Sequence, residues 1–149
     1  MRHVWRVAGA LIGVVASAAG AQVPEARLDV IIAETSAVHA GAGVSVSTGT
    51  YLRSGMVAAL GSSRDGISGR IDLLNRFHLD PFRESRWAPY AGGGLTARFD
   101  DGHKSRVYLL VVFGVDGPAK RGLTTSFEAG FGGGGRIGAV IRRTSAERR

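Results

Sequence analysis

Apolar and polar side chains alternate along residues 87–115, in two runs of strand length separated by a polar turn at residues 100–104. Two such runs joined by a short Asp/Gly turn predict a β-hairpin. In each run every second side chain is apolar, and the side chains between them include glycine, tyrosine and arginine. Successive side chains of a strand point to opposite faces, so one face of the hairpin is apolar and the other is mixed.

The same alternation recurs along most of the chain, and no segment shows the period of a helix. Turn signals separate the runs, and eight strands spaced in this way predict an all-β sandwich or barrel. The remaining strands are expected at residues 27–33, 37–46, 51–61, 67–78, 123–131 and 136–143.

One face of these eight runs carries no charged residue, and the other carries the charges together with many of the 23 glycines. In a soluble barrel the apolar face would point inward. In a membrane barrel it would face lipid. The charged face contains no lysine or glutamine, although a water-facing sheet would normally use them. Glycine weakens a solvated strand but fits a crowded interior. Both observations favour the membrane arrangement, and a soluble barrel remains the alternative.

The membrane arrangement assigns positions to individual side chains. Most of the predicted runs are long enough to cross a bilayer when tilted. Residues expected to face lipid are Leu95, Val107, Leu109, Val111, Phe113 and Phe127. Aromatic residues expected at the membrane interfaces are Phe77, Trp87, Phe99 and Phe131.

Charged residues near the middle of the strands should pair inside the barrel, because a lone buried charge is costly. The expected interior network consists of Arg70, Asp72, Arg98, Arg106, Glu128 and Arg136. The turn at residues 116–121 predicts that Glu128 lies level with Val111 or Val112. Arg106 and Arg136 are its expected partners.

The N-terminus has the pattern of a secretory signal peptide. Arg2 and Arg6 precede an apolar segment, and Ala19-Gly20-Ala21 forms an A-x-A cleavage site. We therefore expect a signal peptide at residues 1–21, a barrel domain at residues 22–143 and a polar tail at residues 144–149. Export is the predicted route, with the outer membrane as destination and the periplasm or medium as the alternative.

Composition excludes several kinds of site. The chain has no cysteine, so it forms neither disulfides nor thiolate metal sites. Its formal net charge is +7, but the arginines are spread over all the strands rather than gathered with stacking aromatics, which argues against nucleic-acid binding. The glycines at residues 132–135 precede a strand instead of the helix that a phosphate loop requires. No cofactor or metal is expected.

The signal peptide, the alternating strands and the glycine-rich segment 89–94 resemble small eight-stranded outer-membrane β-barrel proteins. This resemblance covers residues 22–149 and implies an up-and-down antiparallel barrel closed by its first and last strands. Because no histidine forms a local His-x-Ser pairing with Ser126, we expect a non-enzymatic role, structural or in surface interaction, with outer-membrane lipid as partner and no protein partner identified. The alternatives are a soluble barrel that binds a small apolar ligand and a lipid-modifying hydrolase that uses Ser126 and Glu128.

Overall fold

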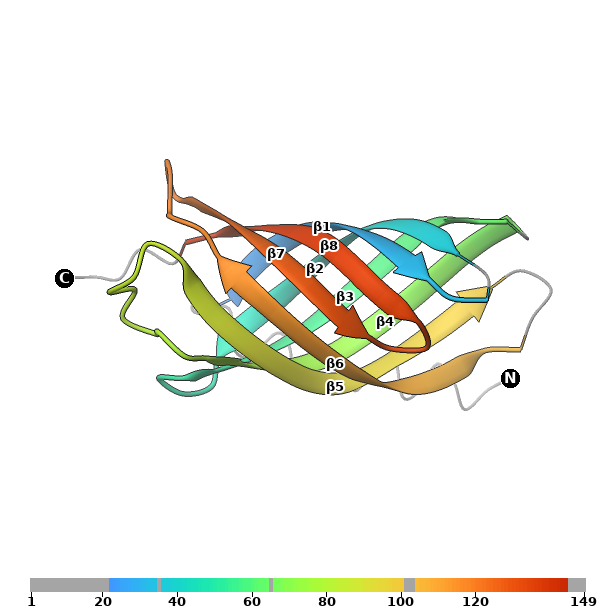
Figure 1. Cartoon of the computed structure of the whole chain (residues 1–149), viewed down its shortest axis with the longest axis horizontal. Helices are drawn as coiled ribbons and strands as arrows, with labels where there is room; N and C mark the ends of the chain where they lie inside the picture. The colour runs from blue at the N-terminus through green and yellow to red at the C-terminus, as the bar shows by residue number, and fades with distance from the viewer. Residues whose placement is uncertain (1–21, 35, 65, 101–103, 145–149) are drawn as a thin grey trace.

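The computed structural model describes residues 22–34, 36–64, 66–100 and 104–144, and these residues form a closed barrel of eight antiparallel strands (Figure 1). The predicted signal peptide and most of the predicted tail lie outside the described residues. The strands are β1 (Gln22–Ile32), β2 (Ala37–Ser47), β3 (Leu52–Ser63), β4 (Gly66–His78), β5 (Ala88–Asp100), β6 (Arg106–Asp116), β7 (Leu123–Phe131) and β8 (Gly135–Arg143). No helix of the described residues is long and apolar enough to cross a membrane.

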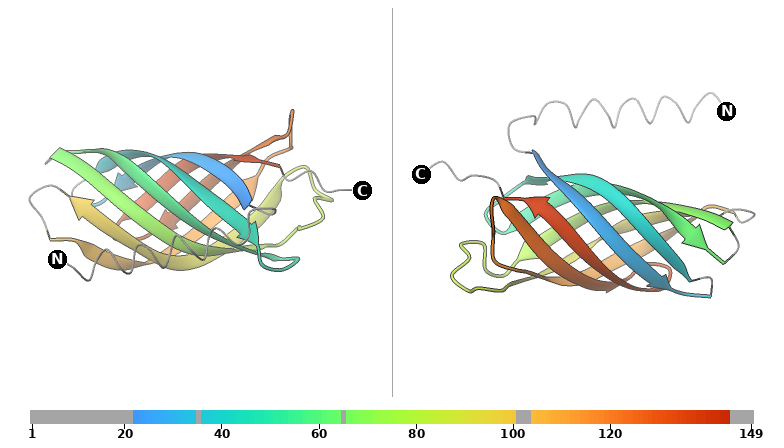
Figure 2. Two further views of the ribbon diagram at one scale, coloured as in Figure 1. Left: turned by 180° about the vertical axis from the view of Figure 1, so that it is seen from behind. Right: turned by 90° about the horizontal axis from the view of Figure 1, so that it is seen from above.

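Each strand pairs with the strand that follows it in sequence, and β8 pairs with β1 to close the barrel. This is the up-and-down order expected from short turns between consecutive strands. The strands run obliquely to the long axis of the barrel (Figure 2). Closure gives every strand a hydrogen-bonded neighbour on both sides, which is how a β-sheet can exist in lipid.

The observed strands match the sequence expectations closely, except in β1. The alternation predicted a strand beginning at residue 27, whereas β1 begins at Gln22 and includes Pro24. Proline argues against a strand interior because it lacks an N–H. Here the β1–β8 ladder begins at Glu25, so Pro24 lies just outside the ladder on that side.

The face assignment made from the alternation matches the burial of the side chains. Along β7, for example, Thr124, Ser126 and Glu128 are buried while Thr125 and Phe127 are exposed. The polar face therefore points into the barrel and the apolar face points out. Apolar burial is small in consequence: Leu74, Leu110 and Val112 form the hydrophobic cluster inside the barrel.

The two ends of the barrel differ in their connections. At one end, which we call the terminal end, lie Gln22, Arg143 and the connections β2–β3, β4–β5 and β6–β7. The β4–β5 and β6–β7 connections project from this end, on the left in Figure 1. The opposite end carries the other four connections, and we call it the hairpin end. The β6–β7 ladder covers Val111–Asp116 of β6, so the ladder stops short of the hairpin end.

Candidate functional site: the interior ion-pair network

The barrel interior is filled by arginines and carboxylates that neutralise one another. Five arginines and five acids, which extend from the terminal end through the middle of the barrel toward the hairpin end, are at most 4% exposed. They are Glu25, Arg27, Asp29, Arg70, Asp72, Arg76, Asp116, Glu128, Arg136 and Arg142. Removing such charges from water is costly unless each finds a partner, and the packed guanidinium groups supply those partners.

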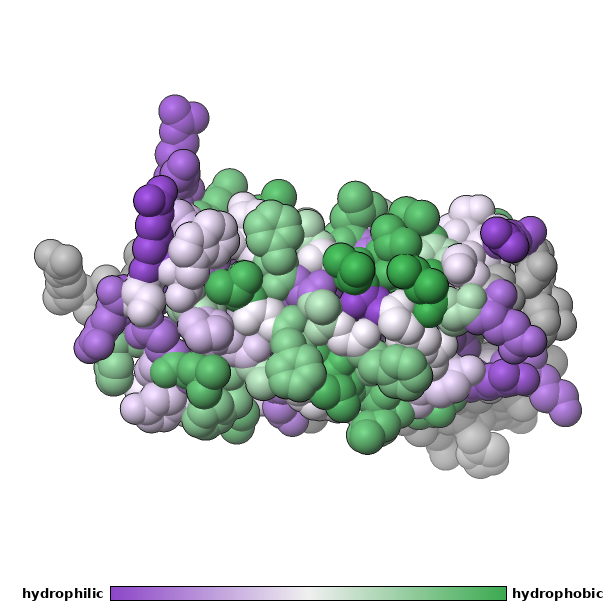
Figure 3. Space-filling model, viewed as in Figure 1, coloured by the Kyte–Doolittle hydropathy of each residue, from purple (hydrophilic) through white to green (hydrophobic). Residues whose placement is uncertain are grey.

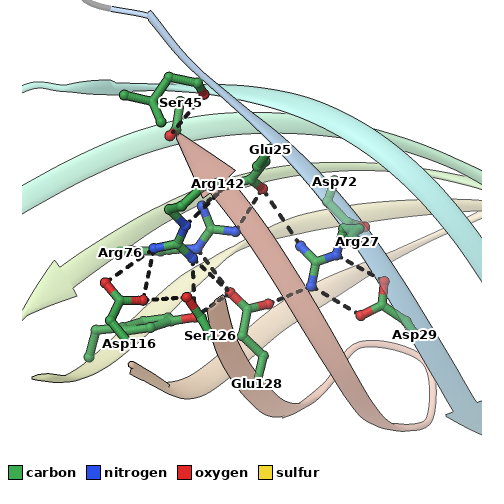
Figure 4. A network of polar contacts seen from close by, with 12 residues as sticks. Glu25, Arg27, Asp29, Ser45, Asp72, Arg76, Asp116, Ser126, Glu128 and Arg142 are labelled. Carbon is green, nitrogen blue, oxygen red and sulfur yellow. Dashed lines mark hydrogen bonds and ion pairs between the residues drawn. The ribbon is translucent and has the colours of Figure 1, made fainter. Parts of the chain in front are cut away.

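Glu128 on β7 accepts hydrogen bonds from groups on three other strands (Figure 4). Arg27 on β1 donates to its Oε2. Oε1 accepts from Arg76 Nε of β4 at 3.1 Å and from the Tyr90 hydroxyl of β5 at 2.8 Å. Arg136 Nη2 of β8 lies 3.6 Å from Oε2. Because β1 and β4 are not neighbours of β7, the first two of these contacts cross the lumen.

Glycines on both neighbouring strands make room around Glu128. Its Cα partners are Gly114 on β6 and Gly138 on β8. A Cβ at Gly114 would meet the Tyr90 ring at 2.3 Å, and a Cβ at Gly138 would meet Asp29 Oδ1 at 2.0 Å. The missing side chains therefore let Tyr90 reach Glu128 and let the Asp29 carboxylate lie beside β8.

A second part of the network lies toward the hairpin end and links Asp29 and Asp72 to three arginines. Arg27 Nε donates to Asp29 Oδ2 at 2.9 Å, and Arg70 also donates to that oxygen. Arg136 Nη1 donates to Asp72 Oδ2 at 2.8 Å. Asp72 also accepts from the hydroxyl of its cross-strand partner on β5. Through Arg27, this part is continuous with the partners of Glu128.

Four of the six expected network residues, Arg70, Asp72, Glu128 and Arg136, lie in this network. Arg98 is buried nearer the hairpin end, where its Nη1 donates to the Gly133 carbonyl at 3.3 Å and Nη2 lies 3.3 Å from Asp100 Oδ2.

The assignment of Arg106 to the interior network was wrong. Arg106 is the first residue of β6, pairs with Arg98 by register and is exposed. Its expected pairing with Glu128 is therefore also wrong. The error came from the β6–β7 connection, because Glu128 lies level with Gly114 instead of Val111 or Val112. Glu128 is thus displaced toward the terminal end, away from Arg106.

Several network residues were missed by the sequence reasoning. Glu25 was missed because the first strand was predicted to begin at residue 27 instead of Gln22, and Asp116 because it was placed in a turn. Arg76 donates to Glu25 through both Nη atoms, at 3.1 and 3.0 Å. Arg142 Nη1 donates to Asp116 Oδ1 at 3.0 Å. Continuing the alternation outward to residues 25 and 116 would have found both acids.

The outer surface is apolar around the middle of the barrel and hydrophilic at its two ends, on the face shown in Figure 3. All six residues expected to face lipid lie on the outside, from Val111 at 37% exposed to Leu109 at 70%. The four expected interface aromatics are also exposed. Phe77 and Trp87 lie near the terminal end, whereas Phe99 and Phe131 lie near the hairpin end. Tyr51 stacks on Phe77 with ring centroids 5.6 Å apart.

Candidate catalytic groups are held in structural hydrogen bonds. Ser126 donates to Asp116 Oδ1 at 2.5 Å instead of meeting a histidine. Ser68 lies 2.9 Å from His39 Nε2, but both residues are 0% exposed. Within the described residues, no group of three or more His, Asp or Glu side chains is arranged to hold a metal ion.

Comparison with solved structures shows the same fold in membrane barrels. A de novo designed transmembrane β-barrel is 13% identical, with a TM-score of 0.62 over 83% of this chain and 94% of that chain. The N-terminal β-barrel domain of Pseudomonas aeruginosa OprF is 10% identical, with a TM-score of 0.62 over 82% and 93%. A second designed barrel, solved by NMR in solution, is 13% identical, with a TM-score of 0.57 over 86% and 98%. No protein-family model and no curated protein sequence matches the chain.

Proposed function

We propose that this chain is an exported outer-membrane-type β-barrel with a non-enzymatic role, structural or in surface interaction. The observation that carries the proposal is the inverted distribution of side chains. Large apolar residues are exposed around the outside, and the interior holds paired charges. In water such an exterior would be unfavourable, whereas lipid solvates it.

Three further observations support the proposal. The strands contain 9 to 13 residues, which suits a tilted crossing of the hydrocarbon layer. The solved structures with the same fold include transmembrane barrels and an outer-membrane-type domain. The predicted signal peptide supplies the route of export. Outer-membrane lipid is then the partner of the exterior.

The interior contents favour this proposal over its two alternatives. A soluble barrel that binds a small apolar ligand needs an apolar cavity inside, and in this barrel arginines and carboxylates occupy the centre. A lipid-modifying hydrolase needs an accessible activated serine, and Ser126 is buried and bonded to Asp116.

Fractionation of cells that express the full chain tests the proposal. We expect the protein to sediment with outer membranes, to resist extraction by alkaline carbonate and to lack the predicted signal peptide. Purified protein should need detergent or lipid to remain folded and monodisperse. Folded, monodisperse protein in detergent-free buffer would contradict the membrane assignment.

A further inference from the structure

A basic cavity opens at the terminal end of the barrel, above the ion-pair network. Its volume is about 470 Å³, and it lies between the ends of β2, β3, β7 and β8 and the β4–β5 connection. Four arginines line it: Arg53, Arg83, Arg142 and Arg143. Hydroxyls also line it, and its lining includes no carboxylate. We call this space the basic vestibule.

Charge balance makes Arg53 the distinctive residue of the vestibule. The ten buried charges of the network comprise five arginines and five acids and cancel. Arg53 lies outside that balance: no ion pair of Arg53 is found within the described residues. Its Nε atom is buried and has no hydrogen-bond partner there. An arginine left in this state is costly unless a further acceptor satisfies it.

The Asp116 carboxylate, which lies beside the vestibule, is already shared among other groups. Asp116 accepts from Arg142 at 3.0 Å and from Ser126 at 2.5 Å, and Arg83 Nη2 lies 3.5 Å away. Asp116 lines a smaller adjoining cavity of about 60 Å³, together with Asp80. One carboxylate thus serves two arginines, so the vestibule retains an excess of positive charge.

Arg83 is held over this opening by the fold of the β4–β5 connection. Its backbone adopts a left-handed φ of 55°. Its Nη1 donates to Thr124 Oγ1 of β7 at 3.2 Å, and Thr124 Oγ1 is 3.0 Å from Thr144 Oγ1. The side chain therefore spans from the connection to β7 at the mouth, and the hydroxyls beside it complete a set of donors.

We propose that the basic vestibule binds a phosphate group, either as inorganic phosphate or as the head group of a phospholipid. A guanidinium group presents paired N–H donors that match the oxygens of phosphate. Phosphate offers more acceptor oxygens than a carboxylate and so can satisfy several arginines together. The cavity is larger than one ion needs, which leaves room for the rest of a head group. This binding activity goes beyond the membrane-barrel function proposed above.

Calorimetric titration of the purified barrel in an uncharged maltoside, in phosphate-free buffer, tests the inference. The probes are inorganic phosphate and dihexanoyl phosphatidylglycerol. We expect at least one to bind, with affinity that falls as salt rises. Equal binding of both identifies a phosphate site, and binding of the lipid alone or more tightly identifies a head-group site. Binding of neither probe would overturn the proposal.

Matched variants locate the site. Arg53→Gln should weaken binding by about tenfold or more, since a charge-assisted contact is lost. This variant should fold, because Arg53 has no described ion pair to break. Arg143→Gln, at the exposed end of β8, provides a second test. Arg106→Gln, at the opposite end, should leave affinity within about twofold because it is exposed and distant. An equal loss in Arg106→Gln and Arg53→Gln would show unspecific attraction and overturn the site.

Discussion

Glu128 connects groups from opposite sides of the barrel, so its replacement should be among the most damaging single changes. Glu128→Gln keeps the size of the side chain but leaves Arg27 and Arg76 buried beside a neutral group. We expect the free energy of unfolding to fall by about 3–5 kcal/mol. Urea titration of the barrel in lipid vesicles measures it.

A double-mutant cycle separates the interaction between Arg76 and Glu128 from the effect of each substitution on its other neighbours. Glu128→Gln combined with Arg76→Gln should show a coupling energy of about 1–3 kcal/mol. Arg106→Gln is the matched control, because Arg106 is exposed, and it should change stability by about 0.5 kcal/mol or less. A strictly additive cycle would mean that Arg76 and Glu128 do not interact.

Gly138 is required by close approach, and its replacement tests the packing around Glu128. Gly138→Ala would place a Cβ 2.0 Å from Asp29 Oδ1, so the carboxylate or the strand must move. We expect destabilisation of about 1–3 kcal/mol. Gly93→Ala is the control on the outer face, where the nearest atom is Leu110 O at 3.7 Å. Its stability should stay the same or rise slightly. Equal effects of the two changes would argue against a crowded interior at Gly138.

Each strand carries one face toward the network and one toward the proposed lipid, and β6 allows the outward face to be tested. Val111→Arg, in the middle of β6, should cost about 2–4 kcal/mol in vesicles, because an arginine there enters the hydrocarbon. Leu123→Arg, at the first residue of β7, should cost about 1 kcal/mol or less since it lies near an interface. Unfolding titrations of both variants measure this depth dependence. In a soluble barrel both side chains would face water, and neither change would cost much.

The β4–β5 connection contains a turn that should respond to pH. Asp80 accepts backbone hydrogen bonds from Ser85 at 2.7 Å and Glu84 at 3.0 Å, and the Ser85 bond in particular lowers the pKa of Asp80. Because the folded pKa is depressed, the turn is stabilised above the unfolded value of about 4. That stabilisation is lost as pH falls through the folded pKa.

Amide NMR shifts provide the measurement for this turn. The Glu84 and Ser85 amides should titrate together with a midpoint below about 4, and Asp80→Asn should abolish the step. The Phe82 amide, which has no described bond to Asp80, serves as the internal control. A midpoint at the ordinary aspartate value would show that the turn does not form in solution. The same turn positions Arg83 at the basic vestibule.

The closed barrel as a unit should not conduct solutes. An eight-stranded barrel is narrow enough for its side chains to fill it. At the level of Glu128 the lumen holds the side chains of Arg27, Arg76 and Tyr90. Liposomes that contain folded protein should therefore swell in arabinose no faster than empty liposomes, with folding checked by heat-modifiable migration on gels. Sugar entry would show that the network opens in the membrane.

The alternation of side chains was enough to predict the strands and their faces. A strand has a strict period of two, so each position on a regular strand is assigned to the inner or outer face once one register is chosen. That rule placed Leu109 outside and Glu128 inside, as the structure has them. It failed at the strand ends, where Glu25 and Asp116 were not recognised as parts of strands.

The partners of the buried charges were decided only by the tertiary structure. Glu128 meets Arg27 and Arg76 because β1 and β4 face β7 across the closed lumen, and no local spacing in the sequence encodes that distance. Its level opposite Gly114 depends on the β6–β7 connection, and an error of two or three residues there made Arg106 an expected partner. The other expected partner, Arg136, does lie beside Glu128, with 3.6 Å between Nη2 and Oε2. The sequence therefore determined which charges point inward along the regular strands, and barrel closure and stagger determined how deeply they are buried and which of them meet.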